Sequence, residues 1–133
     1  YGGATMLGVP TMLVAMLEHP DFATSDLSHV EAICSGGSTV PAPLVERFEK
    51  ELGAPFTIVF GQTELSPVSS MTQTFDTIID KANTIGPAMP HVEVKIIDTE
   101  TGETVPVGTI GEYCARGYLV MHGYYEMPDA TAE

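Results

Sequence analysis

An amphipathic segment between two short apolar runs is the feature that most restricts how this chain can fold. The runs are VEAICSGG (residues 30–37) and PFTIVFGQTE (residues 55–64). Between them, residues 42–53 read APLVERFEKELG, with apolar side chains recurring on one helical face and a glycine where the helix would end. Strand, helix and strand in this order, with an apolar run on each side, predict a parallel βαβ unit.

Both apolar runs end in small or polar residues. The first ends in Ser35-Gly36-Gly37-Ser38 and the second in Gly61-Gln62-Thr63-Glu64, directly after Phe60. Ligands of open α/β sheets bind in the crevice at the carboxyl ends of the strands. Because parallel strands end at the same edge, we expect these two loops to converge on one ligand.

The remainder of the chain has a different pattern. Residues 11–18 predict a buried helix with Thr11 as a possible N-cap, and the methionines at 6, 12 and 16 are expected in the core. Residues 67–90 are long, polar and broken by Gly86-Pro87, which favours a crossing segment between two layers. Residues 92–117 alternate around a turn and predict antiparallel strands. The predicted fold class is therefore α/β, with a βαβ portion over 1–66 and a crossing segment and β-rich portion over 67–133.

The charge balance restricts the partners. Five basic residues face eighteen acidic ones, and the formal net charge is −13. Nucleic acids and anionic membranes need clustered Lys and Arg, so neither is expected as a partner. A small phosphorylated ligand stays possible, since backbone N–H groups, hydroxyls and a metal can bind phosphate.

Two further features bear on the compartment. Cys34 and Cys114 sit in apolar stretches without metal-ligand spacing, so we expect reduced thiols and a cytoplasmic location. The uncharged first seventeen residues are interrupted by Gly8-Val9-Pro10, which argues against a transmembrane segment.

Four stretches together resemble a known family. SGGSTVP, FGQTELSP, IGPAMPHVEVKIID and GTIGEYCARGYLVMHGYYEMPDATAE occur in this order along nearly the whole chain. They are similar to the central part of an AMP-forming acyl-CoA synthetase, a member of the adenylate-forming superfamily, and closest to its fatty and other acyl-CoA ligase branch. The resemblance implies that residues 1–133 are a partial AMP-binding (adenylation) domain, a central fragment of the large N-terminal domain.

The resemblance also implies roles for individual residues. Phe60 would lie against the adenine, where tyrosine is common in the family. Thr63 would bond the α-phosphate of ATP, and Glu64 would hold Mg²⁺; these two are the expected catalytic pair. The loop near the adenine and the acyl group would include Ser38, which stands where alanine is usual. The full set expected to bind the nucleotide is Ser35, Gly36, Gly37, Ser38, Phe60, Gly61, Gln62 and Thr63.

The implied reaction joins a carboxylic acid, expected to be a fatty acid, to AMP from ATP and then to CoA. The alternatives are a non-catalytic adenine-nucleotide-binding module, an adenylation domain serving another acceptor, and an acidic interaction domain. Taken singly, Phe60 also suits a core position, and Thr63 and Glu64 suit a helix cap and first-turn acid. Tyr124 and Tyr125 are expected to pack rather than bind.

Several parts of the family pattern lie outside these residues. They are an upstream Ser/Thr/Gly-rich loop with a lysine, a downstream aspartate for the ribose, and a mobile C-terminal domain with a catalytic lysine. The chain opens on Tyr1 and its last residues, from Pro128, look like a helix start. We therefore expect a piece of a longer enzyme, dependent on the remainder of its parent and inactive by itself.

Overall fold

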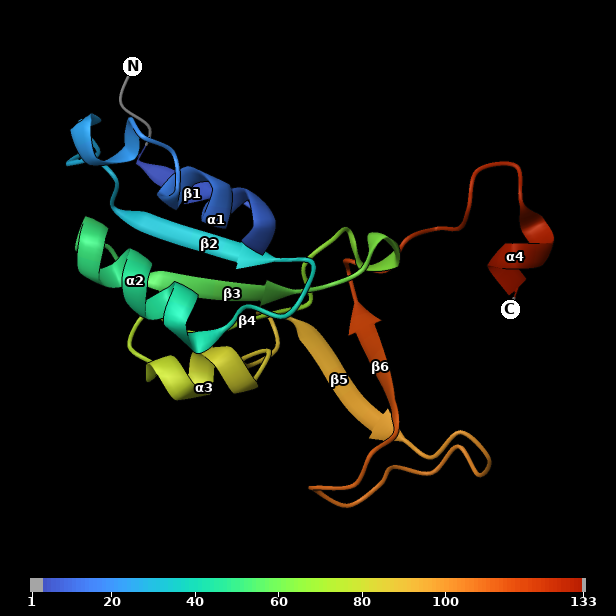
Figure 1. Ribbon diagram of the computed structural model, residues 1–133. Coiled ribbons are helices and arrows are strands. Elements are labelled where there is room, and N and C mark those ends of the chain that lie inside the picture. The colour runs from blue at the N-terminus through green and yellow to red at the C-terminus, as the bar shows by residue number, and fades with distance from the viewer. Residues whose placement is uncertain (1–3, 133) are drawn as a thin grey trace. The chain divides into compact units, whose positions relative to one another are not determined.

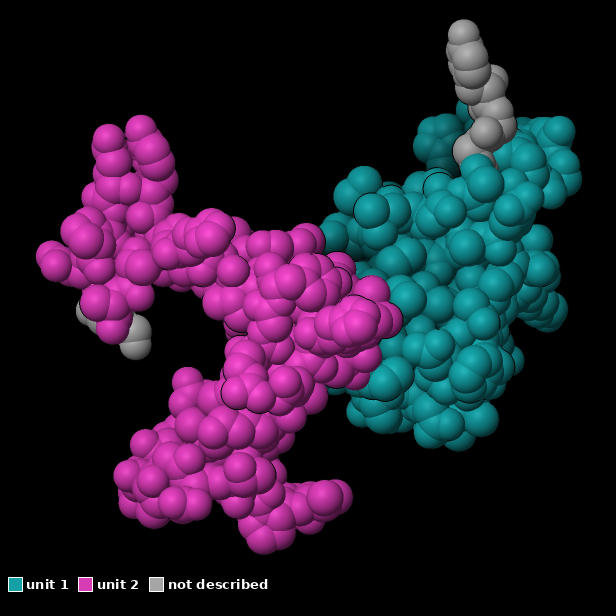
Figure 2. Space-filling model, turned by 180° about the vertical axis from the view of Figure 1, so that it is seen from behind, with its two compact units in different colours: residues 1–60, 70–87 teal, residues 61–69, 88–133 magenta. Residues whose placement is uncertain are grey.

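The computed structural model describes residues 4–132, which form two compact units. The first unit takes the residues up to Phe60 together with Ser70–Pro87, and the second takes Gly61–Ser69 together with the residues from Ala88 onward. Figure 2 colours the two units separately. The units interleave along the sequence, because the chain leaves the first unit after Phe60, returns at Ser70 and leaves again after Pro87.

The first unit contains the predicted βαβ arrangement (Figure 1). Its first three strands form two parallel pairs, with registers such as Thr5 opposite Ala32 and Ile33 opposite Phe56. A short fourth strand pairs antiparallel with the third. The sheet order is β1 (Thr5–Leu7), β2 (Ala32–Gly36), β3 (Phe56–Phe60) and β4 (Ser70–Met71). The α/β fold class with a parallel sheet is thus confirmed.

Helices α1 (Pro10–Leu17) and α2 (Ala42–Leu52) both begin with a proline near the first helical position. Proline presets the helical φ and lacks only an N–H that would have no intrahelical partner there. The N-cap of α1 is Val9, so the expectation of Thr11 as the N-cap was wrong. Gly53 ends α2 in the left-handed region, as the sequence predicted.

Residues 67–90 are more structured than the sequence indicated. They contain β4 and a six-residue helix, α3 (Ile78–Asn83). Thr77 caps α3, since its hydroxyl oxygen accepts a hydrogen bond from the Asp80 backbone N–H at 3.1 Å. A helix of less than two turns carries too little apolar periodicity to stand out from a polar segment.

The core of the first unit joins α1 and α2 to the sheet. Its members are Leu13, Leu17, Val30, Ile33, Val40, Leu44, Val45, Phe48, Ala54, Phe56 and Ile58. In α1 the inward positions belong to Leu13 and Leu17, while Met12 is 56% exposed and Met16 is exposed as well. Placing these two methionines in the core was therefore wrong; Met6 packs against it partly buried.

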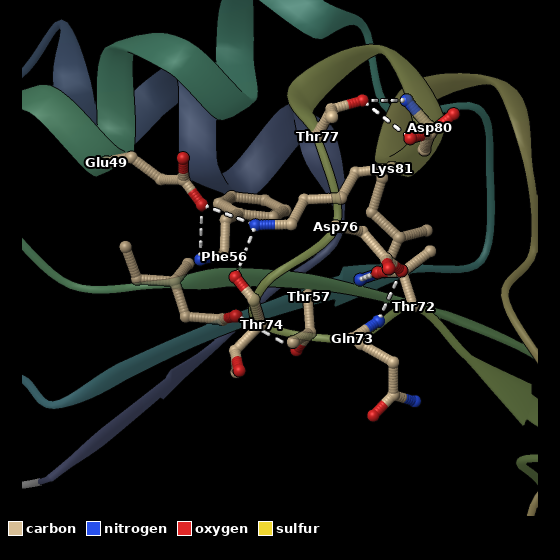
Figure 3. Close-up of polar contacts among 12 residues, drawn as sticks. Glu49, Phe56, Thr57, Thr72, Gln73, Thr74, Asp76, Thr77, Asp80 and Lys81 are labelled. Carbon is tan, nitrogen blue, oxygen red and sulfur yellow. Dashed lines mark hydrogen bonds and ion pairs between the residues drawn. The ribbon is translucent and has the colours of Figure 1, made fainter.

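An ion pair between a buried lysine and a partly buried glutamate links α2 and α3 within the first unit (Figure 3). Lys81, only 2% exposed, donates to Glu49 Oε1 at 2.8 Å and to the Thr74 carbonyl at 3.0 Å. The same Glu49 oxygen accepts the Phe56 backbone N–H at 2.9 Å. One carboxylate thus fastens the start of β3 and the inner face of α3 to α2.

The second unit is built on an antiparallel pair, β5 (Val92–Ile97) and β6 (Glu112–Gly117). It also contains the 3-10 turn η2 (Thr63–Leu65) and the short helix α4 (Pro128–Ala132). Leu65, Val92 and Leu119 form its small core. The predicted antiparallel strands and the helix start at Pro128 are both confirmed.

The structure bears on the two cysteines and on the expected lack of a membrane-spanning segment. Cys34 and Cys114 are both free thiols and partly buried. Among residues 4–132, no helix has the length and apolar character needed to cross a membrane.

Candidate nucleotide site

The turn that follows β3 displays the polar residues of the FGQTE stretch. Gln62 precedes η2 in an extended conformation, and its carbonyl accepts the Leu65 N–H at 2.9 Å. Leu65 is buried in the core of the second unit, whereas Gln62 and Thr63 are exposed. The turn therefore anchors itself through its last residue and leaves an amide and a hydroxyl on its surface.

Two glycines are needed for packing inside the protein. A Cβ on Gly61 would stand 1.6 Å from the Pro67 carbonyl oxygen, and one on Gly36 would stand 2.4 Å from that of Val59. Neither position can accept a side chain without moving the backbone. Gly61 thus lets the turn after β3 close on itself, and Gly36 lets β2 lie tightly beside β3.

The loop after β2 divides into a buried and an exposed part. Ser35 shares the core face of β2 with Ile33; it is 0% exposed, and its hydroxyl has no hydrogen-bond partner among residues 4–132. Gly37, with a φ of 80°, turns the chain, and both it and Ser38 are exposed. Among the predicted nucleotide-binding residues, Ser35 therefore lies beneath the surface that Gly37 and Ser38 form.

Glu64 is held by a segment sixty positions further along the chain. The Tyr124 hydroxyl donates a hydrogen bond to Glu64 Oε1, and the Met121 N–H donates to the Glu64 carbonyl at 2.9 Å. The Tyr124 bond, followed by the backbone N–H of Glu64, lowers the pKa of the Glu64 carboxyl. The same bond to the carboxylate raises the pKa of Tyr124. At neutral pH the carboxylate is therefore charged and the tyrosine is neutral.

Tyr124 is the residue of this site whose contact the sequence analysis missed. It was expected only to pack, but it is 40% exposed and bonds to Glu64. No spacing rule connects positions so far apart, so the sequence offered no signal for the contact. The adjacent Tyr125 was also expected to pack, but its side chain is 87% exposed, so that expectation was wrong.

The side chains near Glu64 suit a magnesium ion whose other ligands are water and nucleotide phosphates. Within residues 4–132 no three His, Cys, Asp or Glu side chains gather closely enough to hold a metal. The Glu64 carboxylate also forms no salt bridge with a described cation. Mg²⁺ commonly takes one or two carboxylates and completes its shell with water and substrate phosphates. A single charged glutamate beside an exposed threonine fits that chemistry and does not fit a zinc or calcium cage.

The predicted residues fall into two groups by their place in the fold. Gly61, Gln62, Thr63 and Glu64 lie on one turn of the second unit. Phe60 ends β3 and the Ser35–Ser38 loop ends β2, and these parallel strands run side by side in the first unit.

Comparison with known proteins gives the class of the fold. The chain superimposes on the anthranilate CoA ligase AuaEII, solved with anthranoyl-AMP, with a TM-score of 0.87 at 24% identity. It also superimposes on the amide bond synthetase McbA from Marinactinospora thermotolerans with a TM-score of 0.85 at 29% identity. Each match covers 98% of this chain, and 24% and 26% of those chains respectively. The architecture is therefore that of adenylate-forming enzymes.

Relatives in sequence make the assignment specific. The AMP-binding enzyme family matches residues 1–125, and the chain belongs to this family. YngI of Bacillus subtilis is 45% identical over 125 residues, which are 93% of this chain and 23% of YngI. The medium-chain acyl-CoA ligase ACSF2, mitochondrial, of Bos taurus is 41% identical over 132 residues, 98% of this chain and 22% of that protein. The chain thus spans less than a quarter of the length of these relatives.

Proposed function

We propose that the chain is part of an ATP-dependent acyl-CoA ligase, which activates a carboxylic acid as an acyl-adenylate and transfers it to CoA. The observation that carries this proposal is the turn after β3, where an exposed Thr63 precedes a Glu64 that keeps its charge without a cationic partner. An ionised carboxylate without a protein cation beside it can serve as a ligand to a metal ion. Membership of the AMP-binding enzyme family supports the nucleotide as the ligand.

Each proposed role uses the chemistry of its side chain. The ring of Phe60 would stack on adenine, a contact worth about 1–3 kcal/mol for a base on an aromatic ring. The Thr63 hydroxyl would donate to an α-phosphate oxygen, and such a bond to a charged group contributes roughly 1.5–3 kcal/mol. The exposed backbone of Gly37 and Ser38 would pass near the adenine and the acyl group. Ser35 would support that loop from within the core.

Glu64 would supply the protein's oxygen ligand to magnesium. When bound, the ion neutralises charge on the phosphates of the nucleotide. The protein's own contribution would be to keep the Glu64 carboxylate ionised and oriented through the Tyr124 bond, and to hold the backbone of η2 through the Met121 bond.

The reaction is a displacement at phosphorus followed by one at carbon. A carboxylate oxygen of the acid attacks the α-phosphorus of ATP, the bond to the β-phosphate oxygen breaks, and pyrophosphate leaves. The CoA thiol, after losing its proton, then attacks the acyl carbonyl, and AMP leaves as the thioester forms. No protein nucleophile takes part, so catalysis rests on positioning and on stabilising charge.

We also propose that the residues belong to a longer polypeptide. The chain spans 23% and 22% of the two relatives named above. Independently, large apolar side chains are exposed over β1 and α1 of the first unit, at Leu7, Val9, Met12 and Val14. Further parts of the same polypeptide would cover this apolar surface. By itself the 133-residue chain would then be inactive.

The acyl group and the compartment are finer proposals. A fatty acid is the proposed substrate, in line with the name of the bovine relative as a medium-chain acyl-CoA ligase. Free thiols at Cys34 and Cys114 favour a reducing compartment, and we propose the cytoplasm, although the bovine relative is named as mitochondrial. A second candidate is an adenylation domain with an amine as its acceptor, which the likeness to the amide bond synthetase McbA favours.

Exchange of labelled pyrophosphate into ATP tests the first half-reaction. With the full-length protein, we expect exchange that depends on both Mg²⁺ and a carboxylic acid, tested over a series of fatty and aromatic acids. Adding CoA should then yield a thioester, whereas an amide formed with an added amine would favour the second candidate. ATP binding without any acid-dependent exchange would instead support a non-catalytic nucleotide-binding module.

A further inference from the structure

We propose that Tyr124 is a positioning residue that holds the Glu64 carboxylate ready for the magnesium ion of a bound nucleotide. The inference rests on the proposed function and adds a residue to it. Both residues belong to the second unit, so their contact lies within one compact body.

The contact is double, and its two bonds act on different parts of Glu64. The Met121 N–H donates to the Glu64 carbonyl at 2.9 Å and so ties the backbone of η2. The Tyr124 hydroxyl donates to Oε1 and so fixes the end of the side chain. A partly exposed glutamate such as Glu64 otherwise samples several rotamers about its three torsions, and ordering the side chain has an entropic cost. Because Tyr124 already orders the Glu64 side chain, less entropy would be lost when a metal ion binds.

Tyr124 is itself held in place. Its backbone N–H donates to Thr131 Oγ1 at 2.9 Å, and the Thr131 hydroxyl donates in turn to the Met127 carbonyl at 2.8 Å. Nearer to η2, Leu119 is buried beside Leu65, the residue that follows Glu64. The segment is thus anchored on both sides of Tyr124, by packing before it and by hydrogen bonds after it.

The choice of a tyrosine rather than a cation points to a metal. A lysine or arginine beside Glu64 would neutralise the carboxylate and compete with a metal ion. A neutral hydroxyl bonded to Oε1 orients the group and leaves its negative charge in place. Partners that orient metal ligands in this way typically raise metal affinity or activity 10–100-fold.

The chain offers a matched control in the next residue. Tyr124→Phe removes one hydroxyl and keeps the ring. Tyr125→Phe removes the same group from a side chain that is 87% exposed and has no part in the proposed site. Both replacements leave the backbone unchanged, and circular dichroism and thermal unfolding would check that each variant is folded.

The experiment measures ATP binding by calorimetry in the full-length protein while Mg²⁺ is varied. We expect Tyr124→Phe to raise the Mg²⁺ concentration needed for half-maximal tightening of ATP binding by about tenfold. Tyr125→Phe should leave it unchanged. In a Glu64→Gln background, Tyr124→Phe should add no further effect, since the carboxylate it orients is gone. Activity at saturating Mg²⁺ should recover in Tyr124→Phe more than in Glu64→Gln.

The possible failures are distinguishable. An unchanged Mg²⁺ requirement in Tyr124→Phe, with a wild type that binds ATP in a Mg²⁺-dependent way, overturns the role of Tyr124 and leaves the proposed function standing. An equal effect of Tyr124→Phe with and without the Glu64 carboxylate also overturns it, because the hydroxyl would then act elsewhere. A wild type that shows no Mg²⁺-dependent ATP binding overturns both proposals together.

Discussion

The two units of this protein differ in the size of their apolar cores. Among residues 4–132, eleven buried apolar residues from strands, helices and loops form the core of the first unit, which also holds the Lys81–Glu49 ion pair. The described core of the second unit has three such residues, beneath a two-stranded sheet whose Val94 is exposed. A two-stranded sheet alone is marginal in water, so the second unit relies on few contacts.

The boundary between the two units falls inside the FGQTE stretch. Phe60 ends the best-packed strand of the first unit, and the next residues, Gly61 to Glu64, belong to the second. The proposed site turn therefore follows directly on a well-packed strand, and Tyr124, the proposed positioning residue, belongs to the unit with the smaller core. We expect amides of β2 and β3 to exchange with solvent more slowly than those of β5 and β6.

The largest expected effect comes from the core of the first unit. Phe48 is 0% exposed and contacts the rings of Phe22 and Phe56. Phe48→Ala should lower the free energy of unfolding by about 4 kcal/mol, since it leaves a cavity among fixed neighbours. Leu119→Ala in the second unit should cost about 2 kcal/mol, because a small core can collapse around the gap. Denaturant unfolding measures both, and a larger loss for Leu119→Ala would reverse the comparison.

Removing the Lys81–Glu49 ion pair of the first unit should have the next largest effect on unfolding free energy. Lys81→Met leaves the Glu49 carboxylate without its cation and should cost about 3 kcal/mol of unfolding free energy. Lys50→Met, at an exposed position of the same helix as Glu49, should stay within about 0.5 kcal/mol of wild type. Combining Lys81→Met with Glu49→Gln should regain part of the loss, as an amide oxygen still accepts the Phe56 N–H. Thermal unfolding measures these losses. Equal unfolding free energies for Lys81→Met and Lys50→Met would show that the ion pair contributes nothing to stability.

In the second unit the expected effect is on rate rather than on folding. Glu64→Gln keeps the size of the side chain and removes its charge, so acid-dependent exchange between pyrophosphate and ATP should fall on the order of a hundredfold or more. Thermal unfolding should change little. Glu100→Gln, at an exposed hairpin position of the same unit, serves as the control and should exchange normally. If Glu64→Gln exchanges at the wild-type rate over a range of Mg²⁺ concentrations, the magnesium role is wrong and Glu64 is only a first-turn acid of η2.

The smallest expected effect concerns the hairpin loop of the second unit. Backbone N–H groups of Thr101 and Glu100 donate to Asp98 Oδ1 and hold the pKa of that carboxyl below its ordinary value. A carboxyl whose pKa is lower when folded contributes stability above its unfolded pKa and loses it as pH falls through the folded one. The amide chemical shifts of Thr101 and Glu100 should therefore move together at acidic pH, below the usual aspartate range. Asp98→Asn should abolish that titration, and a titration that persists would assign it to another group.

Much of the first unit could be predicted because its signals are local. The apolar runs of β2 and β3, the one-sided face of α2 and the closing Gly53 lie within a few residues of one another. The three-residue β1 and the six-residue α3 were missed, since neither is long enough to show a period. The buried face of α1 was predicted wrongly for a related reason. Its residues are apolar on nearly every side, so the sequence does not show which face packs against the core.

The sequence by itself determined the β2–α2–β3 unit, the antiparallel strands of residues 92–117, the polar turn after β3 and the family to which the chain belongs. Those features depend on neighbouring residues and on motifs read in register. Only the tertiary structure decided that Ser35 is buried while Ser38 is exposed, and that Lys81 pairs with Glu49. It alone brought Tyr124 to Glu64. A hydrogen bond needs its partners within about 3 Å in space, and no local pattern encodes which distant residue will arrive there.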